Sequence, residues 1–180
     1  MLRLIALLLL ALAPQAGVPG LPGAPPPSKR PDVPYVPMPD TLVTAILNLA
    51  QVTARDLVYD LGSGDGRIPI AAARLFGARA VGIELEPNLI RRSQDALARS
   101  GLAGLVTFVN ADLFEADISR ATVVTLFLNP GVNRRLMPKL RTELQSGTRV
   151  VSLTFDMGDD WRPDLSQEVN GLEMYLWTIR

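Results

Sequence analysis

The stretch that decides the fold is Asp60-Leu61-Gly62-Ser63-Gly64-Asp65-Gly66-Arg67. It follows the apolar residues 57–59, which are typical of a short buried strand, and it precedes residues 68–76, whose Ala-rich pattern predicts a helix closed by Gly77. Glycines at every second position let a backbone turn tightly and approach a ligand, because no Cβ intervenes. We therefore expect a strand ending at Asp60, a glycine-rich turn and a helix.

The chain on both sides of this turn alternates between helix and strand patterns. Helices are predicted from residue 40 or 41 to residue 50 and over 87–100 and 133–144, and further strands over 80–83, 106–109, 123–128 and 150–155. Asn170-Gly171, between residues 167–169 and 174–179, indicates a β-hairpin. Apolar strands that alternate with helices form a parallel sheet covered on both faces. The expected fold is α/β, with a doubly wound, mostly parallel sheet and a C-terminal antiparallel hairpin.

The first 34 residues have a different composition. The apolar run 4–13 follows Arg3 and is typical of a signal peptide or membrane anchor, so residues 1–16 predict export or membrane association. A cytoplasmic enzyme with a misassigned start is the alternative. Residues 17–34 are rich in proline and predict an extended linker. The folded domain is expected over residues 35–180.

Composition excludes several kinds of chemistry. The chain has neither Cys nor His, so it has no disulfide, no Cys nucleophile, no His general base and no Cys/His zinc site, and no metal site is expected. Its formal net charge is +0. Nucleic-acid binders need clustered Lys and Arg to neutralise phosphates, so we expect no nucleic-acid partner.

Two further carboxylates follow the next two strands. Glu84 ends the second strand, and Asp112 lies just beyond the third. The carboxyl ends of parallel strands meet at one edge of a sheet, where ligands bind, so both should join Asp60 there. Glu84 is placed to accept the two hydroxyls of a ribose, and Asp112 to accept from an adenine amino group. A surface carboxylate and a turn-forming Asp are the respective alternatives.

The glycine spacing distinguishes between nucleotide-like ligands. A dinucleotide site has the pattern G-x-G-x-x-G and directs a helix N-terminus at a pyrophosphate. Residues 62–66 have the pattern G-x-G-x-G, with acids at Asp60 and Asp65. Two carboxylates beside the turn would repel a pyrophosphate, whereas they suit a ligand with an ammonium and a sulfonium. S-adenosylmethionine (SAM) has both.

Residues 60–67, 82–86 and 110–113 resemble successive motifs of the class I SAM-dependent methyltransferases, which implies a Rossmann-like fold. Residues 35–37 and 60–68, with Asp112-Leu113, resemble more narrowly the small protein-lysine methyltransferases of the ATP synthase c-subunit type and their bacterial relatives. The resemblance spans residues 35–165. It implies methyl transfer from SAM to a nitrogen, specifically a lysine side chain of a protein substrate.

The resemblance also implies roles for single residues. Asp60 and the turn would hold the methionine part of SAM, Glu84 the ribose, and Asp112 the adenine edge, while residues 35–37 fold over the cofactor. The residues assigned to the cofactor are Tyr35, Asp60, Gly62, Ser63, Gly64, Gly66, Glu84, Asp112 and Leu113. Asn129 is the candidate catalytic residue, which would contact the incoming nitrogen through its side-chain carbonyl. Residues 129–131 half-match the Asn-Pro-Pro-aromatic motif of methyltransferases that act on nucleic-acid amino groups.

Two other functions compete with methyl transfer. An NAD(P)-dependent oxidoreductase has the same fold, but the glycine spacing opposes it. A non-catalytic SAM-binding or assembly protein is the second alternative, and an exported location would favour it, because SAM is a cytoplasmic metabolite.

Overall fold

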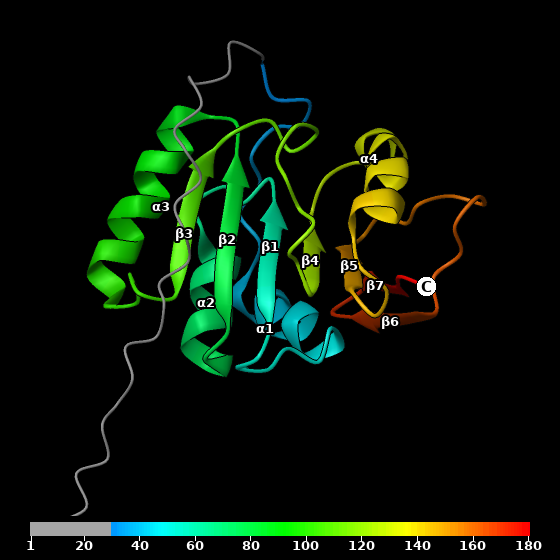
Figure 1. Cartoon of the computed structure of the whole chain (residues 1–180), viewed down its shortest axis with the longest axis horizontal. Coiled ribbons are helices and arrows are strands. Elements are labelled where there is room, and N and C mark those ends of the chain that lie inside the picture. Colours follow the sequence, from blue (N-terminus) through cyan, green and yellow to red (C-terminus); the bar gives the residue numbers. More distant parts are fainter. Residues whose placement is uncertain (1–29) are drawn as a thin grey trace, which may run out of the picture.

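The computed structural model describes residues 30–180, and these residues form a seven-stranded sheet in the order β3-β2-β1-β4-β5-β7-β6 (Figure 1). The first five strands are parallel, and β7 runs antiparallel to both β5 and β6. This confirms the predicted Rossmann-like α/β fold with a C-terminal antiparallel hairpin. The strands are β1 (Leu57–Leu61), β2 (Arg79–Glu84), β3 (Val106–Asn110), β4 (Val123–Leu126), β5 (Arg149–Leu153), β6 (Leu165–Val169) and β7 (Leu172–Thr178).

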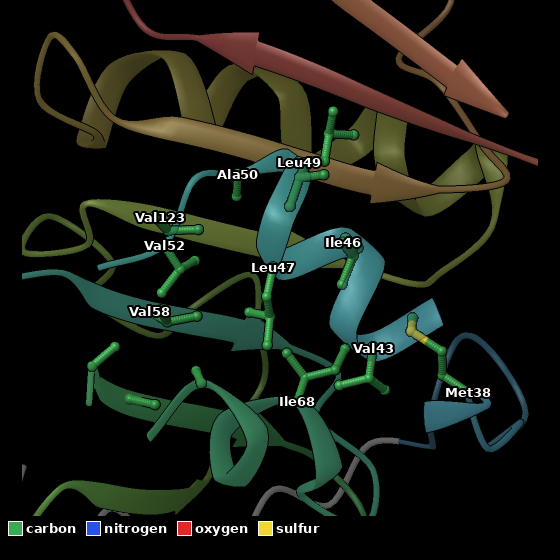
Figure 2. Packing of buried hydrophobic residues seen from close by; sticks show 14 of the residues in the cluster. Met38, Val43, Ile46, Leu47, Leu49, Ala50, Val52, Val58, Ile68 and Val123 are labelled. Atoms are coloured by element: carbon green, nitrogen blue, oxygen red, sulfur yellow. The ribbon is translucent and has the colours of Figure 1, made fainter. Parts of the chain in front are cut away.

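Successive strand residues point to opposite faces of the sheet, and the central strands are mostly apolar on both faces. Helices therefore cover both faces. On one face, α1 (Asp40–Leu49) and α2 (Arg67–Phe76) pack on residues such as Val58 and Val123, as Figure 2 shows for part of this core. Helix α3 (Pro87–Ser100) contacts β2 and β3. On the other face, α4 (Pro130–Glu143) and the segment between β3 and β4 pack on a second apolar cluster. The sheet is therefore doubly wound, and its strand order reverses between β1 and β4.

The junction of β4 and α4 differs from the prediction. Strand β4 ends at Leu126, earlier than expected, and α4 begins at Pro130, three residues before the predicted start. The Asn129 side-chain oxygen accepts a hydrogen bond from the Val132 backbone N–H at 2.9 Å, and Pro130 occupies the first helical turn. Asn at the N-cap and Pro in the first turn are both favourable, so the local sequence starts the helix here.

The C-terminal hairpin follows the prediction closely. Asn170 and Gly171 have φ angles of 54° and 76°, as a two-residue type I′ turn requires. The hairpin places β7 against β5, where Trp177 is fully buried.

No helix within residues 30–180 is long and apolar enough to cross a membrane. The predicted signal peptide or anchor in residues 1–16 lies outside the described residues, so it stays a prediction.

Candidate functional site

A cavity of about 670 Å³ lies at the carboxyl ends of the strands, at the point where the strand order reverses. Every residue that the sequence assigned to the cofactor, except Gly66, lines this cavity. Residues 30–38, which we call the strap, line it as well except for Pro37, and Figure 1 draws the strap in blue across that end of the sheet. The carboxylates predicted to converge therefore do so, as the geometry of a parallel sheet requires.

The glycine turn connects β1 to α2 through left-handed backbone conformations. Gly64 has a φ of +55°, and a Cβ on it would lie 2.6 Å from the Tyr35 ring, so only glycine lets the strap close onto the turn. Gly66 faces away from the cavity. It forms the N-cap of α2, and a Cβ there would clash with the Phe108 ring. This glycine is therefore needed for packing inside the fold, and it does not line the cavity.

Asp60 is the most deeply buried acid of the cavity, with 3% of its surface exposed. Its Oδ1 accepts a hydrogen bond from Thr125 Oγ1 of β4 at 2.7 Å. Burial raises the pKa of Asp60 to about 7 against the lowering effect of this hydrogen bond, and the charges of Glu84 and Asp65 raise it further. A carboxylate held in this environment favours a cationic ligand, because a nearby positive charge would stabilise its ionised form.

Glu84, the last residue of β2, is fixed by two backbone amides. Its Oε2 accepts from the Gly64 N–H at 2.9 Å, and its Oε1 accepts from the Glu86 N–H at 2.8 Å. These hydrogen bonds attach the carboxylate to both the glycine turn and the start of α3. The group is therefore pre-oriented in the cavity wall, and each oxygen keeps acceptor capacity for a hydroxyl.

Asp65 is neutralised by a neighbouring cation. Arg67 pairs with it through two contacts, Nε to Oδ1 at 2.9 Å and Nη2 to Oδ2 at 2.6 Å. Burial opposes ionisation, but the hydrogen bonds from Arg67 and Tyr35 outweigh it and lower the pKa of Asp65. Of the two carboxylates that the sequence placed beside the turn, Asp65 is therefore paired with Arg67, while Asp60, Glu84 and Asp112 also bring carboxylates to the cavity.

Asp112 forms the turn after β3 and also lines the cavity. Its Oδ1 accepts from the Phe114 N–H at 2.9 Å, and its carbonyl oxygen accepts from the Glu115 and Ala116 N–H groups, so it shapes the turn after β3. The same residue lines the cavity beside Leu113. The turn therefore presents Asp112 to the ligand space.

The strap contains residues that sequence reasoning missed. Residues 30–34 were assigned to the linker, yet they line the cavity with Tyr35, Val36 and Met38. The proline content of residues 17–34 predicts an extended backbone, but composition does not reveal that an extended segment docks on the folded domain. Apart from the prolines, Val33 is the one apolar residue among residues 30–34, and it is half-buried. It is the one feature of this stretch that could have indicated packing on the folded domain.

Asn129 does not line the cavity. Its side-chain carbonyl, which was expected to face the incoming nitrogen, accepts from Val132 and caps α4. The half-match to a nucleic-acid methyltransferase motif is accounted for by this helix start. A catalytic role for Asn129 stays a prediction.

One buried polar atom fits a ligand in the cavity. Among the described residues, Ser63 Oγ is buried without a hydrogen-bond partner, and Ser63 lines the cavity. Buried polar groups are normally paired, so this hydroxyl fits a ligand that carries polar groups.

The family model of the ANTKMT methyltransferase domain matches residues 60–165 of the chain. The chain belongs to this family. A protein-lysine N-methyltransferase of Saccharolobus islandicus is 48% identical over 134 residues, which are 74% of this chain and 83% of that protein. A lysine N-methyltransferase of the ATP synthase c-subunit from Xenopus laevis is 39% identical over 73% of this chain, and the match spans 57% of that relative's length.

A solved structure gives the cofactor. The crystal structure described as an RNA methyltransferase from Salinibacter ruber in complex with S-adenosyl-L-homocysteine superposes with a TM-score of 0.78 and 53% sequence identity, covering 80% of this chain and 94% of that one. The protein is a SAM-dependent methyltransferase, as the resemblance implied. Neither an NAD(P)-dependent oxidoreductase nor a non-catalytic assembly protein is supported by these relatives.

Proposed function

We propose that this family member transfers the methyl group of SAM to the side-chain nitrogen of a protein lysine. The observation that carries the proposal is the 48% identity to a protein-lysine N-methyltransferase over 83% of that relative. The vertebrate lysine N-methyltransferases of the ATP synthase c-subunit support it as well, although the chain spans little more than half of their length.

The residues that line the cavity have matching roles in this proposal. Asp60, once ionised, pairs with the ammonium of SAM, and Glu84 accepts from the ribose hydroxyls with its two pre-oriented oxygens. Asp112 and Leu113 bound the adenine end. When bound, SAM supplies a methyl group already activated on a sulfonium. The protein then has to align the acceptor nitrogen and exclude water, and such positioning contributes roughly 7–11 kcal/mol.

The cavity wall beyond β4 suits a lysine side chain. It consists of Phe127, Leu128 and Val132, and Leu128 adjoins the glycine turn, since a Cβ on Gly62 would lie 2.9 Å from Leu128 Cδ2. An apolar wall packs against the methylene groups of lysine and disfavours its charged form, because burial destabilises an ammonium. The nitrogen loses its proton to solvent on entry, and its lone pair then forms the N–C bond while the S–C bond breaks.

RNA is the second candidate acceptor, and the description of the Salinibacter structure is the observation that favours it. Two properties of this chain oppose it. The net charge is +0, and Arg67, one of the cations that line the cavity, is already paired with Asp65. Phosphate contacts supply much of the affinity for nucleic acid, and among the described residues only Arg30 and Arg67 bring a cation to the cavity lining.

Radiolabelling tests the proposal. Purified protein is incubated with cell lysate and SAM carrying a tritiated methyl group, and the product is treated with protease or nuclease. We expect label that protease releases, nuclease does not, and acid hydrolysis recovers as methyllysine. Glu84→Ala is the cofactor-site control and should give little label. Label released by nuclease would assign the activity to RNA, and label in another amino acid would overturn the lysine assignment.

A further inference from the structure

Arg135 lies on α4, outside the cofactor cavity, yet it contacts two of the segments that bound the cavity. Its Nη1 donates to Asp32 Oδ1 at 3.2 Å, and its guanidinium carbon lies 4.2 Å from the centroid of the Phe114 ring. Asp32 belongs to the strap and lines the cavity. Phe114 directly follows Leu113, which lines the adenine end. A single side chain therefore joins the strap, the turn after β3 and helix α4.

The opposite end of the strap is held much more firmly. Arg67 on α2 donates to the Met38 carbonyl oxygen and reaches the Tyr35 hydroxyl at 3.5 Å, while it also pairs with Asp65. These side chains are largely buried, with 29% of Arg67 and 20% of Asp65 exposed. Arg92 adds a contact over the Tyr35 ring at 5.4 Å. Several shared interactions thus fix residues 35–38.

Among the described residues, the contacts at the Arg135 end of the strap are the more exposed ones. The ion pair between Arg135 and Asp32 has one hydrogen bond, and 55% and 32% of the two side chains are exposed. Exposed ion pairs of this kind contribute little and are screened by salt. Val33 packs against the apolar cluster on the α4 face of the sheet, and Leu113 and Phe114 pack against the same cluster. The strap therefore has a firm end at residues 35–38 and a releasable end at residues 30–34.

We propose that Arg135 is a positioning residue that holds the strap closed over the bound cofactor, and that cofactor exchange proceeds by release of Asp32 from Arg135. Each turnover must expel S-adenosylhomocysteine before new SAM enters, and opening of a covering segment commonly limits such a step. Residues 35–38 stay docked on Arg67 and act as the hinge. The proposal depends on the cofactor and not on the identity of the methyl acceptor.

The test measures how fast the product cofactor leaves. Full-length protein is loaded with tritiated S-adenosylhomocysteine and chased with excess unlabelled SAM, and the retained label is followed by rapid filtration. The variants are Arg135→Ala, Asp32→Asn and the double variant. Arg134→Ala, the exposed neighbour on the same helix, is the matched control. Circular dichroism melts establish that each variant is folded.

We expect Arg135→Ala and Asp32→Asn each to release the ligand roughly 3–10-fold faster, as the loss of an exposed ion pair with a ring contact predicts. The double variant should be no faster than the faster single variant, because both remove the same attachment. Raised salt should increase the rate of ligand release from the wild-type protein and leave the release rates of the variants nearly unchanged. A purely structural role for Arg135 would not produce this difference. Wild-type release rates in folded Arg135→Ala and Asp32→Asn, or independent effects that multiply in the double variant, would overturn the proposal.

Discussion

Asp60 is an ionisable carboxyl at a buried position that disfavours its charge, and in the proposed function this charge pairs with the ammonium of SAM. Its pKa in the folded chain is about 7, well above the value near 3.8 of an exposed carboxyl. A raised pKa means that the folded state holds the proton more tightly than the unfolded state. Below pH 3.8 the carboxyl is protonated in both states, so its titration does not lower the free energy of unfolding. That free energy falls progressively as the pH rises from 3.8 towards 7.

Asp60→Asn should consequently stabilise the cofactor-free protein at pH 8. The amide keeps an acceptor for Thr125 and removes the buried charge, so the free energy of unfolding should rise by as much as about 4 kcal/mol at pH 8 and change little at pH 4. Urea denaturation at both pH values measures this difference, with Asp95→Asn on the exposed face of α3 as the control. An equal effect of Asp60→Asn at pH 4 and pH 8 would contradict the argument.

The same titration should make SAM binding depend on pH. Pairing with the SAM ammonium requires ionised Asp60, so below pH 7 binding must release a proton, and affinity should fall by up to about tenfold for each pH unit. Calorimetry at pH 6 in two buffers of different ionisation enthalpy counts the protons released. We expect close to one proton for the wild-type protein and a much smaller value for Asp60→Asn. Proton release that survives this substitution would assign the titration to another group.

At the scale of single elements, the β4–α4 junction separates a structural role for Asn129 from a catalytic one. Asn129→Ala removes the cap of α4 and should lower the free energy of unfolding by about 1 kcal/mol, whereas Asn129→Ser keeps a capping oxygen and should restore most of it. Thermal melts follow stability, and methyl-transfer assays follow the rate per folded molecule. We expect Asn129→Ser to transfer methyl groups within about threefold of wild type, because a cap acts on stability and not on the reacting atoms. A large loss of activity in a stable Asn129→Ser variant would instead support the predicted catalytic role.

Strand ends and the glycine turn were predictable from the sequence because they depend on residues that are close together along the chain. Apolar runs locate β1, β2 and β3, and parallel pairing then forces Asp60, Glu84 and Asp112 to one edge. The ion pair of Asp65 with Arg67 could have been suspected from their spacing, but its consequence for the ligand depends on how the strap docks. The strap itself depends on tertiary contacts of single side chains, such as Asp32 with Arg135, which leave no periodic pattern in the sequence.

At the scale of the whole molecule, the structure bears on where the catalytic unit starts. The prediction placed the boundary at residue 35, whereas residues 30–34 contribute to the cavity and to the ion pair with Arg135. We propose that the functional unit includes residues 30–34. The sheet and its two apolar clusters draw little on residues 30–34, since only Val33 packs against either cluster. Fold and cofactor retention should therefore respond differently to truncation.

Two truncated chains test that boundary. The chain of residues 30–180 should bind SAM with the affinity of the full-length protein. The chain of residues 35–180 keeps Tyr35, Met38 and their contacts with Arg67, so it should fold, but it should bind SAM roughly 3–10-fold more weakly because the exposed Asp32 attachment and the Val33 contact are gone. Calorimetry gives the affinities, and circular dichroism melts establish that both chains are folded. Equal affinities would return the boundary to residue 35. Weaker binding by residues 30–180 than by the full-length chain would instead extend the unit into residues 1–29.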